Sequence, residues 1–270
     1  MARKRRRIRW DRVGIVFGPL LLLILILAVS CHSRSDEDSS VADNSQVSSM
    51  TEYNSTTNAA SGVDAVPVDA ALDELVICID AGHGGEDDGA VNQSETRFEK
   101  NDNLRLALAV EQAFAKYPNV KTIMTRTTDD FVELQTRCDI ANNAGADYFI
   151  SLHRNSATNA NGVEIWINNN NNTWDKRMAE YIMDWLDKVG ISQRRGIQTG
   201  FRNSDSKNET NNYYVNRYTN MPSCLIEMGF MTSEEDNRLF DEHLNEYADS
   251  IAGALIEMLT DNGLYSAAQP

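Results

Sequence analysis

The sequence predicts an α/β domain with a mostly parallel, twisted sheet flanked by helices on both faces. From about residue 72 to residue 264, short apolar runs alternate with longer segments in which apolar residues recur at helical spacing. This alternation is typical of parallel sheets, because each parallel pair of strands needs a crossover connection. The length of this stretch also fits one globular domain.

The first half of the domain begins with a buried strand, LVICID, at residues 75–80. NLRLALAVEQAFAKY at 103–117 repeats apolar residues at mostly helical spacing, and Pro118 suits the end of that helix. VKTIMTR at 120–126 is the next expected strand. FVELQTRCDIANNAG at 131–145 follows as a helix closed by glycine.

The second half continues the alternation. DYFISLH at 147–153 and GVEIWI at 162–167 are expected strands, and an amphipathic helix is expected at 173–190. PSCLIEMGF at 222–230 is the last expected strand. Two helical stretches close the domain, the longer at about 243–260.

The N-terminus predicts a membrane anchor. Residues 1–12 hold seven basic side chains and one acidic one, and residues 13–31 form an uncharged apolar run of nineteen residues. About 20 apolar residues can span a bilayer, whereas the apolar part of a cleaved signal is usually about 7–15 residues long. Basic residues before the span favour a single-pass protein at the cell membrane with the rest of the chain outside the cytoplasm. Cleavage with lipidation at Cys31, or simple secretion, are the alternatives.

Two further boundaries follow from composition. Residues 32–71 are rich in Ser, Thr, Asn and Asp with few large apolar residues, so we expect a disordered linker. The globular domain is expected at residues 72–264 and a short C-terminal tail at residues 265–270.

The charge of the chain argues against two kinds of partner. The net charge is −15, and the first twelve residues contribute +6, so the rest carries −21. A chain of this charge is not expected to bind nucleic acid or to attach electrostatically to anionic lipid.

Three cysteines lie in the domain, at Cys78, Cys138 and Cys224. Each occupies an apolar position, and none forms a short paired spacing of the metal-binding kind. We expect small buried core residues, with their redox state left open.

Polar side chains that can hold a metal or move a proton lie where the expected strands end. His83 follows the first strand, His153 closes the third, and Glu227 lies within the last, while Glu99 leads into the first helix. Two imidazoles and a carboxylate are a common ligand set for catalytic zinc. A second carboxylate can then serve as general base for amide hydrolysis. The long spacings leave this constellation a hypothesis on residue types alone.

The domain resembles the zinc-dependent N-acetylmuramoyl-L-alanine amidases of bacterial cell walls. The resemblance runs from about residue 75 to residue 259 and rests on four segments in family order. These are IDAGHGGEDDGAV at 79–91, FEKNDNLRLAL at 98–108, the long block at 122–157, and NMPSCLIEMGFMTSEED at 220–236. Four ordered motifs are far more specific than GHGG alone.

The resemblance implies a role for each candidate residue. The zinc ligands of the family fall on His83, Glu99 and His153, and its catalytic glutamate falls on Glu227. Asn155 also matches and is expected to support the site or bind substrate.

Other matched positions have lesser roles. Glu95 competes with Glu99, but the following KNDNL matches the family only from Glu99. Arg126 and Arg137 match family arginines that we expect to be structural. Ala81 and Asp88 stand where the family often has proline, and neither departure removes a ligand.

The implied activity is cleavage of the amide bond between the lactyl group of N-acetylmuramic acid and L-alanine in peptidoglycan, in cell-wall remodelling. Two alternatives stay open: a zinc peptidase acting within the stem peptide, and a catalytically silent wall-binding domain. The polar segments 168–173 and 192–212 are expected to border the substrate groove. The physiological process and the need for a protein activator are not predicted.

Overall fold

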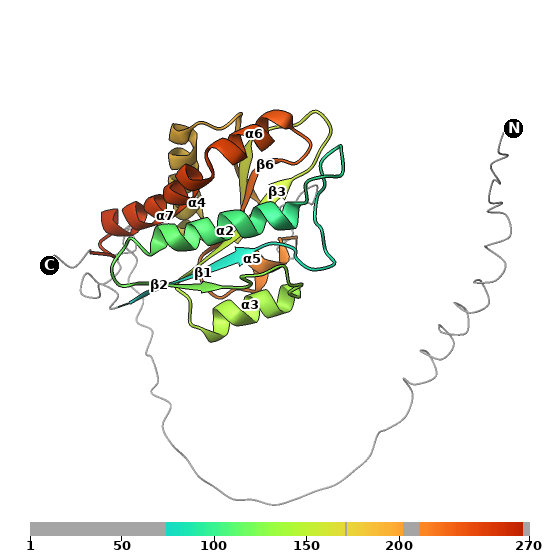
Figure 1. Cartoon of the computed structure of the whole chain (residues 1–270). Coiled ribbons are helices and arrows are strands. Elements are labelled where there is room, and N and C mark those ends of the chain that lie inside the picture. Colours follow the sequence, from blue (N-terminus) through green and yellow to red (C-terminus); the bar gives the residue numbers. More distant parts are fainter. Residues whose placement is uncertain (1–73, 171, 202–210, 267–270) are drawn as a thin grey trace, which may run out of the picture. The chain divides into compact units, whose positions relative to one another are not determined.

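The computed structural model describes residues 74–170, 172–201 and 211–266, which form a single α/β domain with a mixed sheet flanked by helices (Figure 1). The strands are β1 (Leu75–Ala81), β2 (Val120–Met124), β3 (Tyr148–Asn155), β4 (Val163–Ile167), β5 (Arg194–Thr199) and β6 (Ser223–Phe230). The helices are α2 (Glu99–Phe114), α3 (Leu134–Asn143), α4 (Thr173–Val189), α5 (Tyr214–Tyr218), α6 (Glu234–Glu242) and α7 (Leu244–Asp261).

The sheet has the strand order β2-β1-β3-β6-β4-β5. Every neighbouring pair is parallel except β4 with β6, which is antiparallel. The predicted mostly parallel sheet is therefore mixed, with one reversal between β6 and β4. Because β1, β3 and β6 run in the same direction, their carboxyl ends meet at one edge of the sheet.

Helices cover both faces of the sheet, as predicted. On one face, α2, α4 and α7 pack over a core that includes Ile77 and Ile79 of β1 (Figure 1). On the other face, α3 and α5 lie over a smaller core that includes Cys78 and Phe149. Strands buried on both sides read as continuous apolar runs, which is why β1, β3 and β6 were recognisable from the sequence.

The sequence missed β5 and α5. β5 has the composition RRGIQT, and it lies at the sheet edge with its residues half-buried or exposed, so it carries no apolar alternation. Part of the polar segment 192–212, which was expected to border the groove, is therefore a strand. The helix α5 is five residues long, too short for a periodic signal.

The helix expected at 103–117 begins four residues earlier, at Glu99. Its first turn contains Glu99 and Asp102, which are polar and yet buried, with 4% and 2% of their surfaces exposed. These residues break the apolar pattern because they serve a polar site rather than the core.

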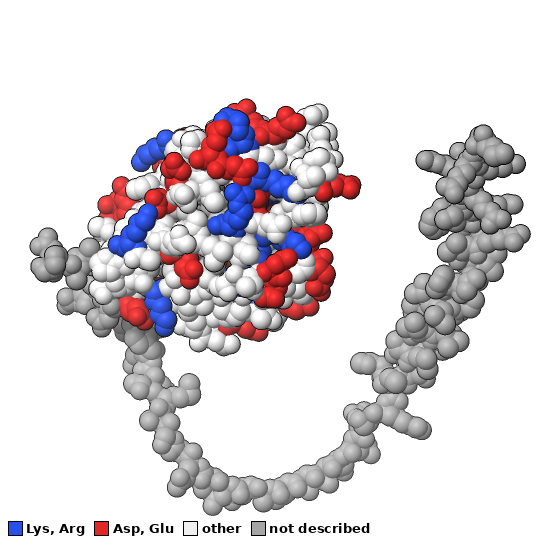
Figure 2. All heavy atoms as spheres, viewed as in Figure 1, with Lys and Arg blue, Asp and Glu red and all other residues white. Residues whose placement is uncertain are grey.

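The predicted basic tail, anchor and linker at 1–12, 13–31 and 32–71 lie outside the described residues, as does most of the C-terminal tail. Among the helices that are described, none combines the length and apolar character that a bilayer span requires. Figure 2 shows acidic and basic side chains interspersed over one face of the described domain, with the acidic ones more numerous.

Candidate functional site

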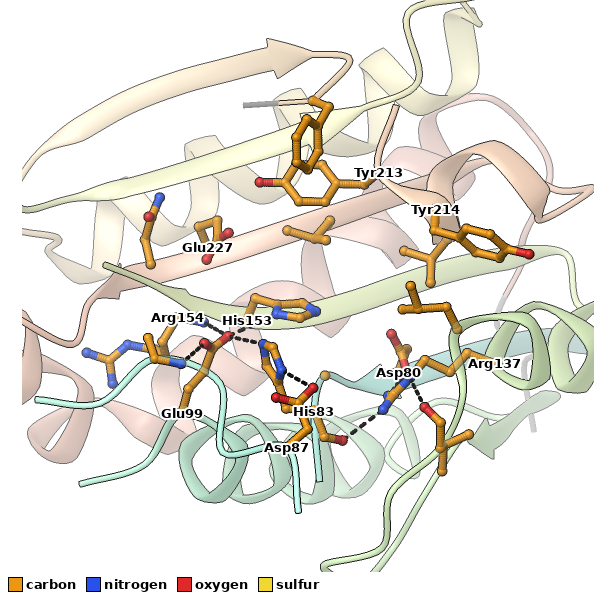
Figure 3. Close-up of a pocket in the computed structure, with 18 of the residues that line it drawn as sticks. Asp80, His83, Asp87, Glu99, Arg137, His153, Arg154, Tyr213, Tyr214 and Glu227 are labelled. Carbon is orange, nitrogen blue, oxygen red and sulfur yellow. Dashed lines mark hydrogen bonds and ion pairs between the residues drawn. The ribbon is translucent and has the colours of Figure 1, made fainter. Parts of the chain in front are cut away.

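The four predicted site residues come from elements that meet at the carboxyl edge of the sheet. His83 lies two residues after β1, His153 lies in β3 and Glu227 lies in β6. Glu99 is the first residue of α2, which packs across β1 and β3. Figure 3 shows these side chains around one pocket.

His83, Glu99 and His153 form a compact cluster. One ligand atom from each lies within 4.8 Å of the others. The Glu99 Oε1 atom is 2.9 Å from His153 Nδ1 and 3.3 Å from His83 Nε2. Two imidazole nitrogens and a carboxylate oxygen fit the donor set of a catalytic zinc ion, which leaves a coordination position for substrate or water.

The carboxylate of Glu99 is held on both oxygens. The backbone N–H of Ala90 donates to Oε2 at 2.7 Å, and the backbone N–H of Arg154 donates to Oε1 at 3.0 Å. Burial by itself would raise the pKa of Glu99, but hydrogen bonds with His153 and His83 hold it well below its ordinary value. Glu99 is therefore ionised, as a metal ligand must be.

His83 is oriented by a second carboxylate. Its Nδ1 atom lies 2.7 Å from Asp87 Oδ2, which turns Nε2 toward Glu99. A carboxylate on the outer nitrogen is the usual arrangement around a metal-bound histidine. Burial would lower the pKa of His83, yet the hydrogen bonds with Glu99 and Asp87 raise it to about 9.

Two glycines allow the backbone to approach the cluster closely. A Cβ atom on Gly82 would lie 2.2 Å from His153 Cε1, and one on Gly89 would lie 2.7 Å from Glu99 Oε2. Gly89 also has φ of +64°, which favours glycine. His83 itself adopts φ of +60°, an uncommon conformation for a residue with a side chain, held here by the surrounding contacts.

Glu227 lies next to His153 across the sheet. The two residues are register partners on the parallel strands β3 and β6, and Glu227 is 7% exposed. Figure 3 shows Glu227 projecting from β6 into the same pocket. Asn155 also lines the pocket, and its Nδ2 donates to Glu164 Oε1 at 2.7 Å.

The pocket has a volume of about 740 Å³ and is lined by both polar and apolar side chains. The cluster and Glu227 line it, and so do aromatic and aliphatic side chains, among them Phe131, Leu134, Tyr213 and Tyr214. Phe131 and Leu134 are 41% and 52% exposed, so apolar surface lies open beside the polar site.

Three other residues singled out from the sequence lie outside the cluster of His83, Glu99 and His153. Glu95 is an exposed turn residue outside the cluster. Arg126 donates to four backbone carbonyls, including those of Ala81 and Gly82. Arg137 donates to the carbonyls of Val132, Ala81 and His83 and to Asp80 Oδ1. Both arginines thus support the loop that carries His83.

Cys78, Cys138 and Cys224 are buried, as expected, and all three are free thiols. Burial raises the pKa of both Cys78 and Cys138 to about 12 and also raises that of Cys224. None of these thiols supplies a thiolate near neutral pH.

Sequence reasoning missed three buried charged residues around the site, Asp80, Arg154 and Glu164, each at most 4% exposed. Glu164 accepts from Asn155, Trp166 and Arg195. A charged residue inside an apolar strand, the signal that marked Glu227, was present in VEIWI as well.

Comparisons with known proteins identify the family to which the domain is similar. Residues 77–261 match the profile of the family described as N-acetylmuramoyl-L-alanine amidase. The N-acetylmuramoyl-L-alanine amidase CwlM of Bacillus licheniformis is 36% identical over 161 residues, which is 59% of this chain and 58% of that protein. A Bacillus subtilis protein named uncharacterized protein YqiI is 33% identical over 188 residues, which is 68% of this chain and 84% of that protein.

A solved structure shows the same fold. The catalytic domain of CwlV, an N-acetylmuramoyl-L-alanine amidase from Bacillus (Paenibacillus) polymyxa var. colistinus, is 34% identical and superposes with a TM-score of 0.60. The superposition covers 69% of this chain and 98% of that structure. The described domain thus corresponds to a whole amidase catalytic domain.

Proposed function

The chain belongs to the N-acetylmuramoyl-L-alanine amidase family and is a peptidoglycan amidase, and we propose that its activity depends on a zinc ion held by His83, Glu99 and His153. The observation that carries this proposal is the convergence of their three ligand atoms within 4.8 Å. The bond cleaved is the amide between the lactyl group of N-acetylmuramic acid and L-alanine.

Each side chain then has a chemical task. A zinc ion supplies Lewis-acid polarisation of a carbonyl and activation of water. Glu227, buried beside His153, accepts the proton of the attacking water and delivers it to the departing amino group. Asn155, fixed by Glu164, orients the substrate at the same edge of the pocket. No nucleophilic side chain is needed.

We also propose that residues 13–31 hold the chain at the cell membrane, with the catalytic domain outside the cytoplasm. The uncharged apolar run and the basic residues before it support this location. A flexible linker of 32–71 would have a root-mean-square reach of about 35 Å, which keeps the domain close to the membrane. Fractionation and extraction of the membranes with alkaline carbonate test this location, and the chain should stay in the membrane pellet. Recovery in the culture medium would indicate secretion, and labelling by palmitate would indicate a lipoprotein.

The activity is tested by digesting intact peptidoglycan with the purified full chain and identifying the fragments by mass spectrometry. The proposal expects stem peptides that begin with a free L-alanine amino group. Their release should stop on chelation and return with zinc, and Glu227→Gln should abolish it. Cleavage within the stem peptide would indicate a peptidase instead. Binding to peptidoglycan with no release of fragments would favour the wall-binding alternative.

A further inference from the structure

Arg154 is a buried arginine next to a proposed zinc ligand. It follows His153 on β3, and 1% of its surface is exposed, which makes it the largest fully buried side chain in the described domain. A buried guanidinium is costly unless its charge and its donors are satisfied. Its partners therefore indicate what the residue does.

The side chain of Arg154 contacts three separate elements. Its guanidinium donates to Asp102 Oδ2 of α2 at 2.6 Å and to Asn237 Oδ1 of α6 at 2.7 Å. A longer contact of 3.4 Å runs from Nε to the backbone carbonyl of Gly229 in β6. The guanidinium carbon also lies 4.3 Å from the centre of the Phe240 ring in α6.

These partners lie beside the residues that do the chemistry. Asp102 is three residues after Glu99 on α2, so the two share one helical turn. Gly229 is two residues after Glu227 on β6. In addition, the backbone N–H of Arg154 donates directly to Glu99 Oε1 at 3.0 Å.

We propose that Arg154 is a positioning residue, which fixes the elements carrying Glu99, His153 and Glu227 in the arrangement that binds zinc and moves the proton. This inference rests on the proposed function of those three residues. The planar guanidinium group suits this role, because it can donate hydrogen bonds to two side chains in fixed directions at the same time.

Asp102 is itself held from a second side. Arg97 Nε donates to the same Oδ2 atom at 2.7 Å, and Arg97 continues outward to Asp241 at the surface. On the other side, Asn237 Nδ2 donates to the carbonyl of Met231, just after β6. Asp102 and Asn237 are thus each held by a further hydrogen bond, so the Arg154 guanidinium meets partners whose positions are fixed.

A purely structural ion pair is the competing explanation, because buried pairs are common and contribute little net stability. The two explanations differ in what the loss of Arg154 changes. A structural pair alters the melting temperature alone. A positioning residue also alters zinc affinity and kcat at temperatures where the protein is fully folded.

The test uses the full chain with Arg154→Met, Arg154→Lys and Asn237→Ala, and with Met183→Ala as a control. Met183 is fully buried in α4, belongs to the larger hydrophobic core and does not line the pocket, so its truncation should lower stability without removing a site contact. Zinc affinity is measured by competition with a chromogenic chelator. kcat and KM are measured on a soluble muropeptide below every melting temperature.

We expect Arg154→Met to lower zinc affinity and kcat each by about 10–100-fold, with KM within about threefold. Arg154→Lys should not restore zinc affinity or kcat, because an ammonium group lacks the planar set of donors of a guanidinium. Asn237→Ala, which removes one hydrogen-bond partner of Arg154 at a half-buried position, should lower zinc affinity and kcat by about three- to tenfold. Met183→Ala should keep parental zinc affinity and kcat.

The inference is overturned if Arg154→Met is folded and its zinc affinity and kcat lie within twofold of the parent. If Arg154→Met does not fold, Asn237→Ala decides, and parental zinc affinity and kcat in that variant overturn the inference. A parent that binds no zinc and releases no stem peptide contradicts the proposed function itself. A parent that does both while the variants match it contradicts only the role of Arg154.

Discussion

Two buried carboxylates lie near the end of β1, and they differ in the partners that surround them. Asp80 accepts from Thr125, Arg137 and Ser151 at 2.6–2.7 Å, so its charge meets a permanent cation and two hydroxyl donors. Glu99 also accepts from two backbone N–H groups, but in place of a permanent cation it faces two imidazoles. A buried carboxylate neutralised by a fixed guanidinium stabilises the fold, whereas one that faces imidazoles can exchange their protons for a metal ion and do chemistry.

The largest effect is expected from breaking the Glu99 cluster. His153→Ala removes one of the three zinc ligands, and a Lewis acid contributes several kcal/mol to the transition state. Amidase activity should fall by about 10³-fold or more, and zinc should be lost. Activity is followed by release of stem peptides and zinc by metal analysis. The control is His243→Ala, at the junction of α6 and α7, which should behave as the parent.

Breaking the Asp80 cluster should act on stability instead. Asp80→Asn leaves the buried guanidinium of Arg137 without its counter-charge, which is expected to cost about 3–5 kcal/mol of unfolding free energy. Chemical denaturation measures the loss, with the exposed Asp139→Asn within about 0.5 kcal/mol of the parent as control. A stability change below 1 kcal/mol, together with lost zinc, would show that Asp80 belongs functionally with Glu99.

Lowering the pH should remove the stability that the Asp80 cluster contributes. Burial would raise the pKa of Asp80, but Arg137 and Ser151 lower it below its ordinary value of 3.8. The stability that Asp80 contributes is therefore complete above about pH 4 and is lost as the pH falls through its lower folded value.

Zinc affinity should depend on pH through His83. In the metal-free chain the pKa of His83 is about 9, so below that pH a zinc ion must displace a proton. Apparent zinc affinity should rise about tenfold per pH unit, or about 100-fold from pH 7 to pH 9, and then level off. Chelator competition across this range measures it. An affinity that is constant above pH 7 would mean that Glu99 and Asp87 do not hold His83 protonated.

A third buried carboxylate has neither a cation nor an imidazole among its partners in the described domain. Asp175 on α4 has a backbone donor, the N–H of Ser223 at 3.0 Å, and burial raises its pKa to about 6. Its contribution to stability is fully present below pH 3.8 and is lost as the pH rises through 6. Asp175→Asn should therefore stabilise the protein by about 3 kcal/mol at pH 8 and by little at pH 4. Equal effects in denaturation at both pH values would contradict this.

The sequence could predict much of this arrangement because its strongest signals are local. The buried strands β1, β3 and β6 are apolar runs, and the four site residues lie in motifs that keep their residue types and order. β5 and α5 were missed because an exposed edge strand and a single helical turn leave no periodic pattern.

Arg154 could not be predicted for a different reason. Its partners Asp102 and Asn237 are 52 and 83 residues away along the chain, and nothing in SLHRNSA shows that the arginine is buried. Polar side chains in an apolar context, such as Asp102 in the first turn of α2 and Glu164 in β4, were the available signals. Such signals indicate that a buried polar side chain has a partner, but they do not identify that partner.

A crystal structure of the zinc-loaded protein, with anomalous data at the zinc edge, would show whether His83, Glu99 and His153 hold the metal and leave Glu227 to move the proton. We expect one strong peak about 2.0–2.2 Å from His83 Nε2, from a nitrogen of His153 and from an oxygen of Glu99. Glu227 should face that peak without ligating it. A peak elsewhere, or one in which Glu227 replaces a histidine as ligand, would show that these three residues do not form the zinc site.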